Sequence, residues 1–402
     1  MLQRQNFMYL FQMHLSIVNC YNGSLFRYNK NLNQLEGCKR SKCRYITMLI
    51  TSFCFTAVLA IQMLEADNVS FGMKAQSGFF LVSFSNLWIV NWLVLKAEQE
   101  ICQLSNRIFQ FEARHYKRFG DHWNDAKEMV LKVVRLFDFI GTTTSVVSYI
   151  IYICQIWVQP CFPGNFGYMF YAECKSQIFS SGWTTYMNSW VEVAVKIILV
   201  WFSSTCALFM FSTFTLVVAQ FTCVFSFCYR NYLIYLQNIM GLLKQQKTIC
   251  DEQRNDLIIY KQIQVLLIHH NCIHQSLIVV VLLNQAMFVV IVGLFLIIGM
   301  YTRLEIAQQL LFVVLGFDAL LVLVVVFGIL GLVYVSSMKT LEIGKEIQIL
   351  RKDPWARRYI RSWPPLKIGL GSVNFIDKLT GLVSVDFSVN QTVNLLMMDR
   401  KN

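Results

Sequence analysis

The chain has 402 residues, of which 56% are hydrophobic and only 14% are charged, well below the charge of about 25% that is usual in soluble domains. This composition excludes a collagen-like, disordered or soluble globular protein and indicates a membrane protein. The formal charge of +12 does not point to nucleic acid, because the basic residues lie between apolar runs and not together on one soluble face.

A helix needs about 20 mostly apolar residues to cross the hydrocarbon of a bilayer. Seven stretches are long and apolar enough, so we expect an all-α membrane protein with seven transmembrane helices. In chain order these are Tyr45–Leu64, Ala75–Leu95, Phe139–Val158, Ile197–Phe225, Ser276–Met300, Leu310–Val335 and Leu379–Met398. The chain then divides into a segment 1–44, one membrane domain 45–398 and a tail 399–402. Asp318 and Asp386 are the only charged residues within the seven spans.

The orientation follows from the positions of Lys and Arg, because cytoplasmic loops retain these residues. The segments 1–44, 96–138, 226–275 and 336–378 together hold 29 of them, whereas the connections on the opposite side and the C-terminal tail hold five. We therefore expect a cytoplasmic N-terminus and an extracellular C-terminus. This is the reverse of a G-protein-coupled receptor.

Apolar residues recur at helical spacing inside the cytoplasmic segments, which predicts that helices continue below the membrane. The recurring residues are Ile101, Leu104, Ile108 and Phe111, then Leu236, Ile239 and Leu243, then Ile259, Ile263 and Leu266. Two interpretations of these apolar faces remain open. They pack against the same helices of neighbouring subunits in a cytoplasmic bundle, or they lie on the inner leaflet of the membrane.

The predicted outer loops carry two candidate modification sites. Asn68 is the one Asn-x-Ser/Thr match on an outer loop, so it is the glycosylation candidate. Cys161 and Cys174 lie in the long loop between the third and fourth spans. They either form a disulfide that pins a lid over a pocket or remain two unpaired thiols.

Signals for catalysis are scarce, and we expect a protein that is not an enzyme and has no cofactor. His270 and His274 have a spacing that metal ligands use, with His269 and Cys272 beside them, but no Glu stands within the motif to act as a base. We interpret these residues as a polar cluster at the cytoplasmic end of the fifth span and not as a metal site.

The last span differs from the other six because polar residues form one stripe along it. Thr380, Ser384, Ser388, Gln391 and Asn394 are separated by three or four residues, so they share a face of a helix. Such a stripe needs water or another protein surface beside it. The functional interpretation is an aqueous pore, which requires several chains around an axis; the alternative is a buried seam of hydrogen bonds. Asp386 and Asn390 lie off the stripe, and we expect them to bond a neighbouring helix.

A family resemblance becomes specific just before this span. The segment reads Arg361-Ser362-Trp363-Pro364-Pro365-Leu366-Lys367-Ile368 and is followed by Gly371, Thr380, Ser388, Leu395 and Leu396. It resembles the C-terminal signature of insect odorant receptors, in which an Arg-Ser-x-x-Pro-Leu stretch and a glycine lead into a final pore helix. The chain departs from the family at Val389, where a Tyr is common, and at Thr392, where an aromatic residue is expected.

The resemblance implies a ligand-gated, non-selective cation channel in the dendrite plasma membrane of olfactory neurons. It also implies assembly with a shared odorant co-receptor as a heterotetramer, and a small volatile organic ligand in an outer pocket among the second, third, fourth and sixth spans. The ligand-binding candidates on these spans are Phe79, Phe80, Phe84, Tyr149, Tyr152, Gln155, Trp201 and Phe312. Each aromatic residue has ordinary helix packing as its alternative role. A gustatory receptor or, less readily, a transporter would also fit the span pattern.

The ion path is expected along the last span, narrowest towards its outer end. The pore candidates are Ser384, Ser388, Gln391, Asn394, Leu395 and Met398. Bulky apolar side chains can close a pore by dewetting, and amides can replace the hydration of an ion when the helices move apart. We expect weak selectivity among cations, because no ring of Asp or Glu stands at the level of Gln391, Asn394, Leu395 and Met398.

Overall fold

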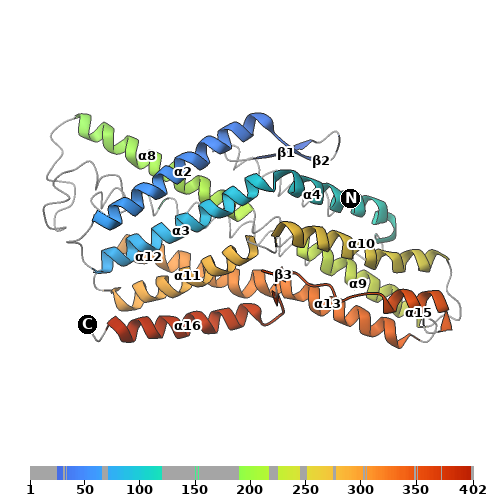
Figure 1. The fold of residues 1–402 in the computed structure, drawn as a ribbon. Coiled ribbons are helices and arrows are strands. Elements are labelled where there is room, and N and C mark those ends of the chain that lie inside the picture. Colours follow the sequence, from blue (N-terminus) through green and yellow to red (C-terminus); the bar gives the residue numbers. More distant parts are fainter. Residues whose placement is uncertain are drawn as a thin grey trace.

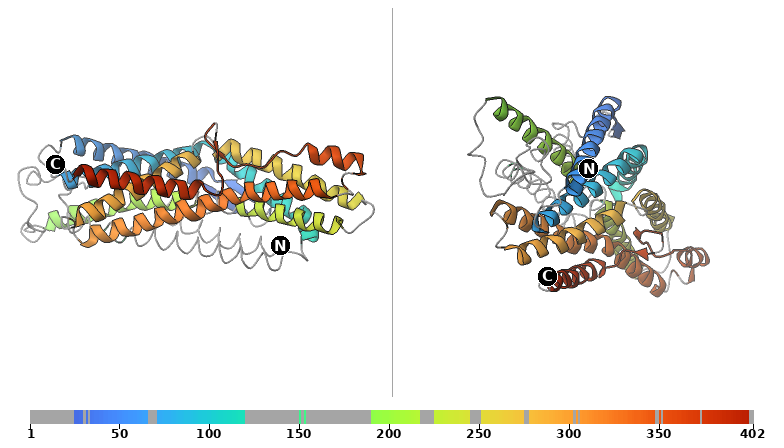
Figure 2. Two further views of the ribbon diagram at one scale, coloured as in Figure 1. Left: turned by 90° about the horizontal axis from the view of Figure 1, so that it is seen from below. Right: turned by 60° about the vertical axis from the view of Figure 1, so that its left-hand side comes forward.

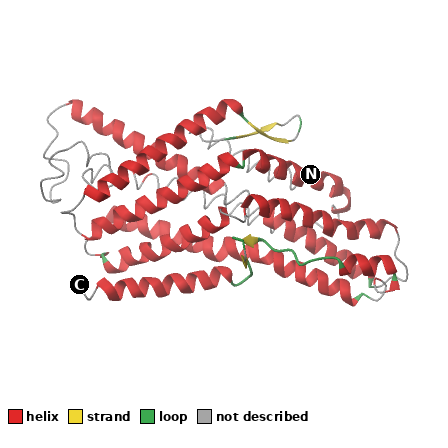
Figure 3. Cartoon of the chain, viewed as in Figure 1, coloured by secondary structure: helices red, strands yellow, loops and turns green. Residues whose placement is uncertain are grey.

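The computed structural model describes most of the chain as a long bundle of helices (Figure 1, Figure 3). The described residues are 25–29, 32, 34–65, 71–119, 150, 153, 190–216, 225–244, 251–274, 278–301, 304, 306–347, 350, 352–372 and 374–399. The two hairpins in this part of the chain are short and antiparallel. The structure therefore confirms an all-α membrane architecture.

The elements have the following bounds in chain order. They are β1 Phe26–Asn29, β2 Gln34–Gly37, α2 Lys39–Glu65, α3 Phe71–Lys96, α4 Glu98–Phe119, α8 Trp190–Leu216, α9 Phe225–Leu243, α10 Asp251–His274, α11 Ile278–Gly299, α12 Ile306–Leu321, the π-helix η4 Val322–Val326, α13 Phe327–Glu346, α15 Pro354–Arg361, β3 Gly369–Leu370, β4 Asn374–Phe375 and α16 Thr380–Asp399. Because η4 joins α12 to α13, these three elements form one continuous helical rod.

Four helices in the described part are long and apolar enough to cross a membrane. They are Ser41–Leu64, Lys74–Lys96, Ile278–Gly299 and Gln308–Glu346, and they match the first, second, fifth and sixth predicted spans. A shorter apolar helix, Val200–Met210, lies within the predicted fourth span. The predicted third span lies almost entirely outside the described residues. The predicted seventh span is the helix α16, which is less apolar than the other four.

The helices α4, α9, α10 and the later part of α13 form a second bundle beyond the membrane-length helices (Figure 1). The recurring apolar residues of the sequence form its core, and Leu104, Leu236, Ile259 and Ile263 have no exposed surface. Both interpretations of these faces were therefore wrong. The faces pack against one another within one chain, because four helices from distant parts of the sequence come together and bury them without a second subunit or a lipid surface.

The N-terminal hairpin of β1 and β2 is docked on α4. The side chain of Asn106 accepts a hydrogen bond from the amide of Leu35 at 2.7 Å and donates one to the Leu35 carbonyl at 3.0 Å. Lys42 forms an ion pair with Glu98 at 2.6 Å. These contacts allow α2 to begin at Lys39, six residues before the predicted start of the first span.

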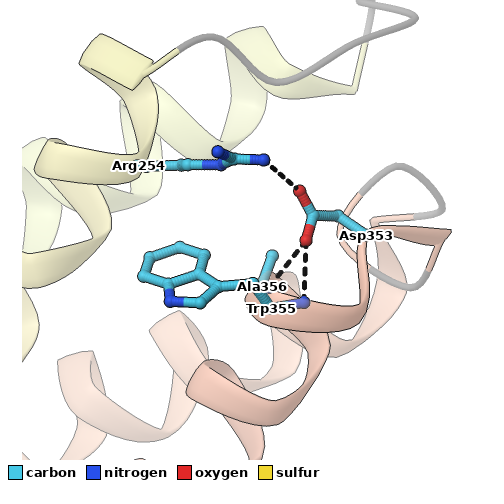
Figure 4. Close-up of polar contacts among 4 residues, drawn as sticks. All are labelled: Arg254, Asp353, Trp355 and Ala356. Atoms are coloured by element: carbon cyan, nitrogen blue, oxygen red, sulfur yellow. Dashed lines mark hydrogen bonds and ion pairs between the residues drawn. The ribbon is translucent and has the colours of Figure 1, made fainter.

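The short helix α15 at the far end of the second bundle has a well-defined N-terminus (Figure 4). The carboxylate of Asp353 accepts hydrogen bonds from the amides of Trp355 at 2.8 Å and Ala356 at 3.1 Å, and it pairs with Arg254 of α10 at 3.0 Å. The Ala356 amide, together with Arg254 and the Trp355 amide, lowers the pKa of Asp353. The charged cap is therefore present at neutral pH and is lost only as the pH falls below the ordinary range of Asp.

Replacing Asp353 by Ala should destabilise α15 by about 1 kcal/mol, the usual cost of removing an N-cap. Asp353→Ser keeps an acceptor for the helix amides and loses only the partly exposed ion pair, so its effect should be smaller. Hydrogen–deuterium exchange of the segment that contains Trp355 and Ala356 measures both effects. Equal acceleration of exchange in the two variants would show that the cap does not stabilise this helix.

Candidate functional site

Four of the predicted ligand-binding residues meet in one aromatic cluster. Phe79, Phe80 and Phe84 come from α3 and Phe312 comes from α12, and all four are buried. The ring centroids of Phe79 and Phe312 are 5.1 Å apart, and those of Phe80 and Phe312 are 6.2 Å apart. The structure thus brings together side chains that are more than 200 positions apart in the sequence.

Two further rings complete this cluster, and the sequence interpretation missed both. Phe55 of α2 contacts Phe84 at 5.4 Å between ring centroids, and Phe288 of α11 stacks on Phe79 at 5.8 Å. They come from the first and fifth spans, which were not expected to contribute to the pocket. No signal in the sequence distinguishes them from other phenylalanines of these spans, because an aromatic residue in an apolar helix can face a neighbouring helix or lipid.

Polar groups border the cluster. Gln76 of α3 donates from its Nε2 to the Oε1 of Gln308 on α12 at 3.3 Å, and both side chains are buried. Asn86 of α3 donates to the Oε1 of Gln285 on α11 at 2.7 Å. An apolar site with a few polar groups is typical for the binding of a small organic molecule.

Trp201 does not belong to this cluster, and the prediction for it was wrong. Its side chain on α8 is 67% exposed, so it lies on the outer surface of the chain and not among the buried rings. The other candidates of the ligand and loop regions lie outside the described residues. These are Tyr149, Tyr152, Gln155, Asn68, Cys161 and Cys174.

The helix α16 is reached through an extended strap, defined as residues 363–372, which runs from α15 back towards the membrane-length helices (Figure 3). The ring of Trp363 stacks on Tyr260 of α10 at 4.3 Å between centroids, and the Tyr260 hydroxyl donates to the carbonyl of Pro364 at 2.7 Å. Burial raises the pKa of Tyr260 to about 12. The hydroxyl therefore remains a hydrogen-bond donor at physiological pH.

Two more side chains hold the strap by its backbone. Ser337 of α13 accepts a hydrogen bond from the amide of Leu366 at 2.7 Å. Asn271 of α10 donates to the carbonyl of Lys367 at 2.8 Å and accepts from the amide of Gly369 at 3.2 Å. The strap ends in the hairpin of β3 and β4, where Gly371 has a φ of +66°. This left-handed turn explains the glycine of the signature.

The small polar residues of α16 face the interior of the same chain. Ser384, Ser388 and Thr392 are buried, and their hydroxyls donate to the carbonyls of the residues four positions earlier. Thr392 also contacts the carbonyl of Ile291 on α11 at 3.3 Å. The prediction that Ser384 and Ser388 line a pore was therefore wrong. Small residues at a regular spacing allow close helix packing, and this was the signal that could have corrected it.

Two glycines bring the start of α16 into close contact with the long helical rod. A Cβ on Gly381 would collide with the carbonyl oxygen of Leu323 in η4, and a Cβ on Gly331 of α13 would collide with the backbone of Asp377. A π-helix segment often marks a functional position in a helix. Here it provides the carbonyl against which α16 packs.

The opposite face of α16 is exposed, and the helix lies at the edge of the bundle (Figure 2). Asp386, Asn390 and Asn394 are exposed and follow one another at intervals of four residues, with Asn390 donating to Asp386 at 3.4 Å. Within the described residues, Asp386 and Asn390 bond each other and not a neighbouring helix, contrary to expectation. Among the other pore candidates, Met398 is exposed, and Gln391 and Leu395 are half-buried at the margin of this face.

No group of three or more His, Cys, Asp or Glu side chains could hold a metal ion within the described residues. His270 is buried, with its ring 5.8 Å from that of Tyr229 and 6.5 Å from that of Phe225, whereas Cys272 is exposed. His270 is thus part of an aromatic packing contact between α9 and α10.

Comparisons with known proteins give the class of this fold. No family model matches the chain, and no curated protein matches it. Two solved structures of the insect olfactory receptor OR5 from Machilis hrabei match with a TM-score of 0.68, each covering 98% of this chain and 100% of that chain. Their sequence identities are 12% and 13%, and the second structure contains eugenol.

The chain thus has the fold of the insect olfactory receptors, over nearly its whole length. The resemblance that the C-terminal signature indicated is confirmed for the fold. Both matched structures are olfactory receptors.

Replacing Gly381 by Ala should separate α16 from η4, because the added methyl group would meet the Leu323 carbonyl. We expect a loss of stability of about 1–3 kcal/mol, seen as a lower melting temperature of the detergent-purified protein. Gly328→Ala is the matched control, since a Cβ there meets no atom within 4 Å. An equal melting temperature for Gly381→Ala and the control would contradict the close approach.

Proposed function

We propose that the chain is an odorant receptor subunit that forms a ligand-gated cation channel with other subunits. The observation that carries this proposal is a stripe of polar residues on the exposed side of α16, which is otherwise mostly apolar. Asp386, Asn390 and Asn394 lie on it, and a charged residue at membrane depth needs water or a partner beside it.

The depth of this face within the membrane follows from the contacts of α16 with the membrane-length helix α11. Thr392 contacts Ile291, and Leu396 lies against Gly299 at the end of α11. The two helices therefore run side by side in the same direction. Asp386 precedes Thr392 by six residues, or about 9 Å along a helix, which places it beside the middle of the apolar helix α11 and not at its end.

An exposed carboxylate at this level would be costly in lipid. If several copies of α16 surround an axis, the polar face of each copy lines a common water-filled path, and the cost is removed. The path would be open to cations because its charged side chain is acidic. Met398, with Leu395 at its margin, would form the apolar narrow part near the outer end.

The ligand would act at the aromatic cluster in the outer half of the bundle. Phe312 lies on α12, which continues through η4 to the point where Gly381 packs. A displacement of α12 by a ligand can thus reach α16 through one continuous helix. The ligand must bind the open arrangement more tightly than the closed one, since equal affinity would leave the equilibrium unchanged.

The remaining parts of the proposal follow from the resemblance and from the distribution of charge. The other subunits are an odorant co-receptor, and the complex is a tetramer in the dendrite plasma membrane of olfactory neurons. The N-terminus is cytoplasmic and the C-terminus extracellular, as the 29 basic residues on one side against five indicate. The eugenol complex of the Machilis hrabei receptor supports a small aromatic volatile as the kind of ligand.

The orientation can be tested with an epitope placed after Asn402. Antibody should stain unpermeabilised cells, because the C-terminus follows α16 on the extracellular side. An epitope at the N-terminus is the control and should be stained only after permeabilisation. Staining of the C-terminal epitope only in permeabilised cells would reverse every assignment of inside and outside.

The conduction path can be tested by replacing Asp386 with Asn in cells that also express a co-receptor. Odour-evoked current should persist, but the permeability of cations relative to chloride and the single-channel conductance should fall, because each copy loses one negative charge from the path. Asp386→Glu keeps the charge and is the matched control.

Two results would contradict different parts of this proposal. Unchanged permeability and conductance in Asp386→Asn would mean that the exposed face of α16 does not line the path. An absence of odour-evoked current from the unmodified chain, when it reaches the cell surface with its co-receptor, would contradict the receptor function itself.

A further inference from the structure

The helices α3 and α12 face each other in two layers near their outer ends. In the first layer Gln76 of α3 contacts Gln308 of α12. In the second layer, Phe79 and Phe80 contact Phe312. Because side chains four positions apart lie on the same face of a helix, the amide layer lies directly above the aromatic layer, about 6 Å away along the helix axes.

The side-chain amide of Gln76 makes a hydrogen bond through only one of its two polar atoms. Its Nε2 donates to the Oε1 of Gln308 at 3.3 Å. Its own Oε1 is buried and receives no hydrogen bond from any residue in the described part of the chain, although the side chain is only 2% exposed. A buried acceptor without a donor is unfavourable and rare in folded proteins.

Two amides that hold backbone segments in place, those of Asn106 and Asn271, use both the donor and the acceptor of the side chain. Asn106 donates to and accepts from the backbone of Leu35. Asn271 donates to the carbonyl of Lys367 and accepts from the amide of Gly369. The unused oxygen of Gln76 therefore sets it apart from these structural amides, and it lies next to the cluster where the ligand is proposed to bind.

The contact with Gln308 fixes the chemistry of a group that could use this oxygen. In the structure Gln308 presents its Oε1 and Gln76 turns its Nε2 towards it, which leaves the Gln76 oxygen for a ligand. The ligand group must then be a hydrogen-bond donor. A cationic amine would need a carboxylate, but the two layers consist of amides and phenylalanines, so the fitting donor is a neutral hydroxyl.

We propose that the Oε1 of Gln76 accepts a hydrogen bond from the hydroxyl group of the ligand, so that this receptor selects small alcohols or phenols over the corresponding ethers. This inference rests on the proposed receptor function and names its ligand class. The phenylalanine layer contacts the apolar or aromatic skeleton of the ligand, and Gln76 distinguishes the polar group. An ether of the same skeleton leaves the buried oxygen without a donor.

The test compares the potency of matched pairs of ligands that differ only by methylation of the hydroxyl. The pairs are eugenol and methyl eugenol, benzyl alcohol and benzyl methyl ether, and 1-octanol and 1-methoxyoctane. In the unmodified receptor we expect each effective hydroxyl compound to be about tenfold more potent than its ether, the scale for one net hydrogen bond. Gln76→Met keeps the length of the side chain and removes the acceptor, so the potency ratio should fall to about one.

Gln237→Met is the matched control. Gln237 is a half-buried glutamine of α9 in the second bundle, away from the aromatic cluster, and its Nε2 donates to the carbonyl of Ser336 at 2.9 Å. This variant should keep the tenfold ratio even if its overall response is smaller. Because the readout is a ratio within one variant, a loss of surface expression does not affect it.

Three results would overturn this inference while leaving the receptor function intact. They are a ratio near one in the unmodified receptor, an unchanged ratio in Gln76→Met, and responses to esters, ketones or ethers without any response to the hydroxyl compounds. An absence of current with every volatile would instead contradict the proposed function.

Discussion

The hydrogen bonds that hold the strap against α10 and α13 determine where α16 lies. The chain leaves the second bundle at α15 and must return to the membrane-length helices without a helix to satisfy its backbone. Tyr260, Ser337 and Asn271 provide the missing partners. Each bond contributes only about 1 kcal/mol net, but an unpaired buried amide or carbonyl would cost more. The strap is therefore held in one path.

The position of α16 then decides which of its faces is free. Gly381, Ser384, Ser388 and Thr392 have small side chains, and they permit the close approach to η4 and α11. The larger polar side chains cannot be accommodated at that contact and remain on the outside. The proposed conduction path thus depends on side-chain size, because size selects the packed face of the helix.

The rod formed by α12, η4 and α13 connects three regions of the molecule. Its first part carries Gln308 and Phe312, its π-helix carries the Leu323 carbonyl, and its last part carries Ser337, which binds the strap. A ligand that moves the first part would shift both contacts of the final helix at once. This arrangement gives a physical route between the proposed ligand cluster and the proposed path, with no separate hinge required.

The sequence alone determined the class of the fold, the four confirmed membrane-length helices and the helices of the second bundle. These features depend on local length and periodicity, so one segment carries the whole signal. The sequence could not decide the exposed face of α16. Both Ser384 and Asp386 are polar, and only the packing of α16 against η4 and α11 decides that Ser384 is buried and Asp386 is exposed. It also could not place Trp201, because an aromatic residue suits lipid and protein surroundings equally. The unused oxygen of Gln76 was visible only in the tertiary structure, since its one partner, Gln308, is 232 positions away.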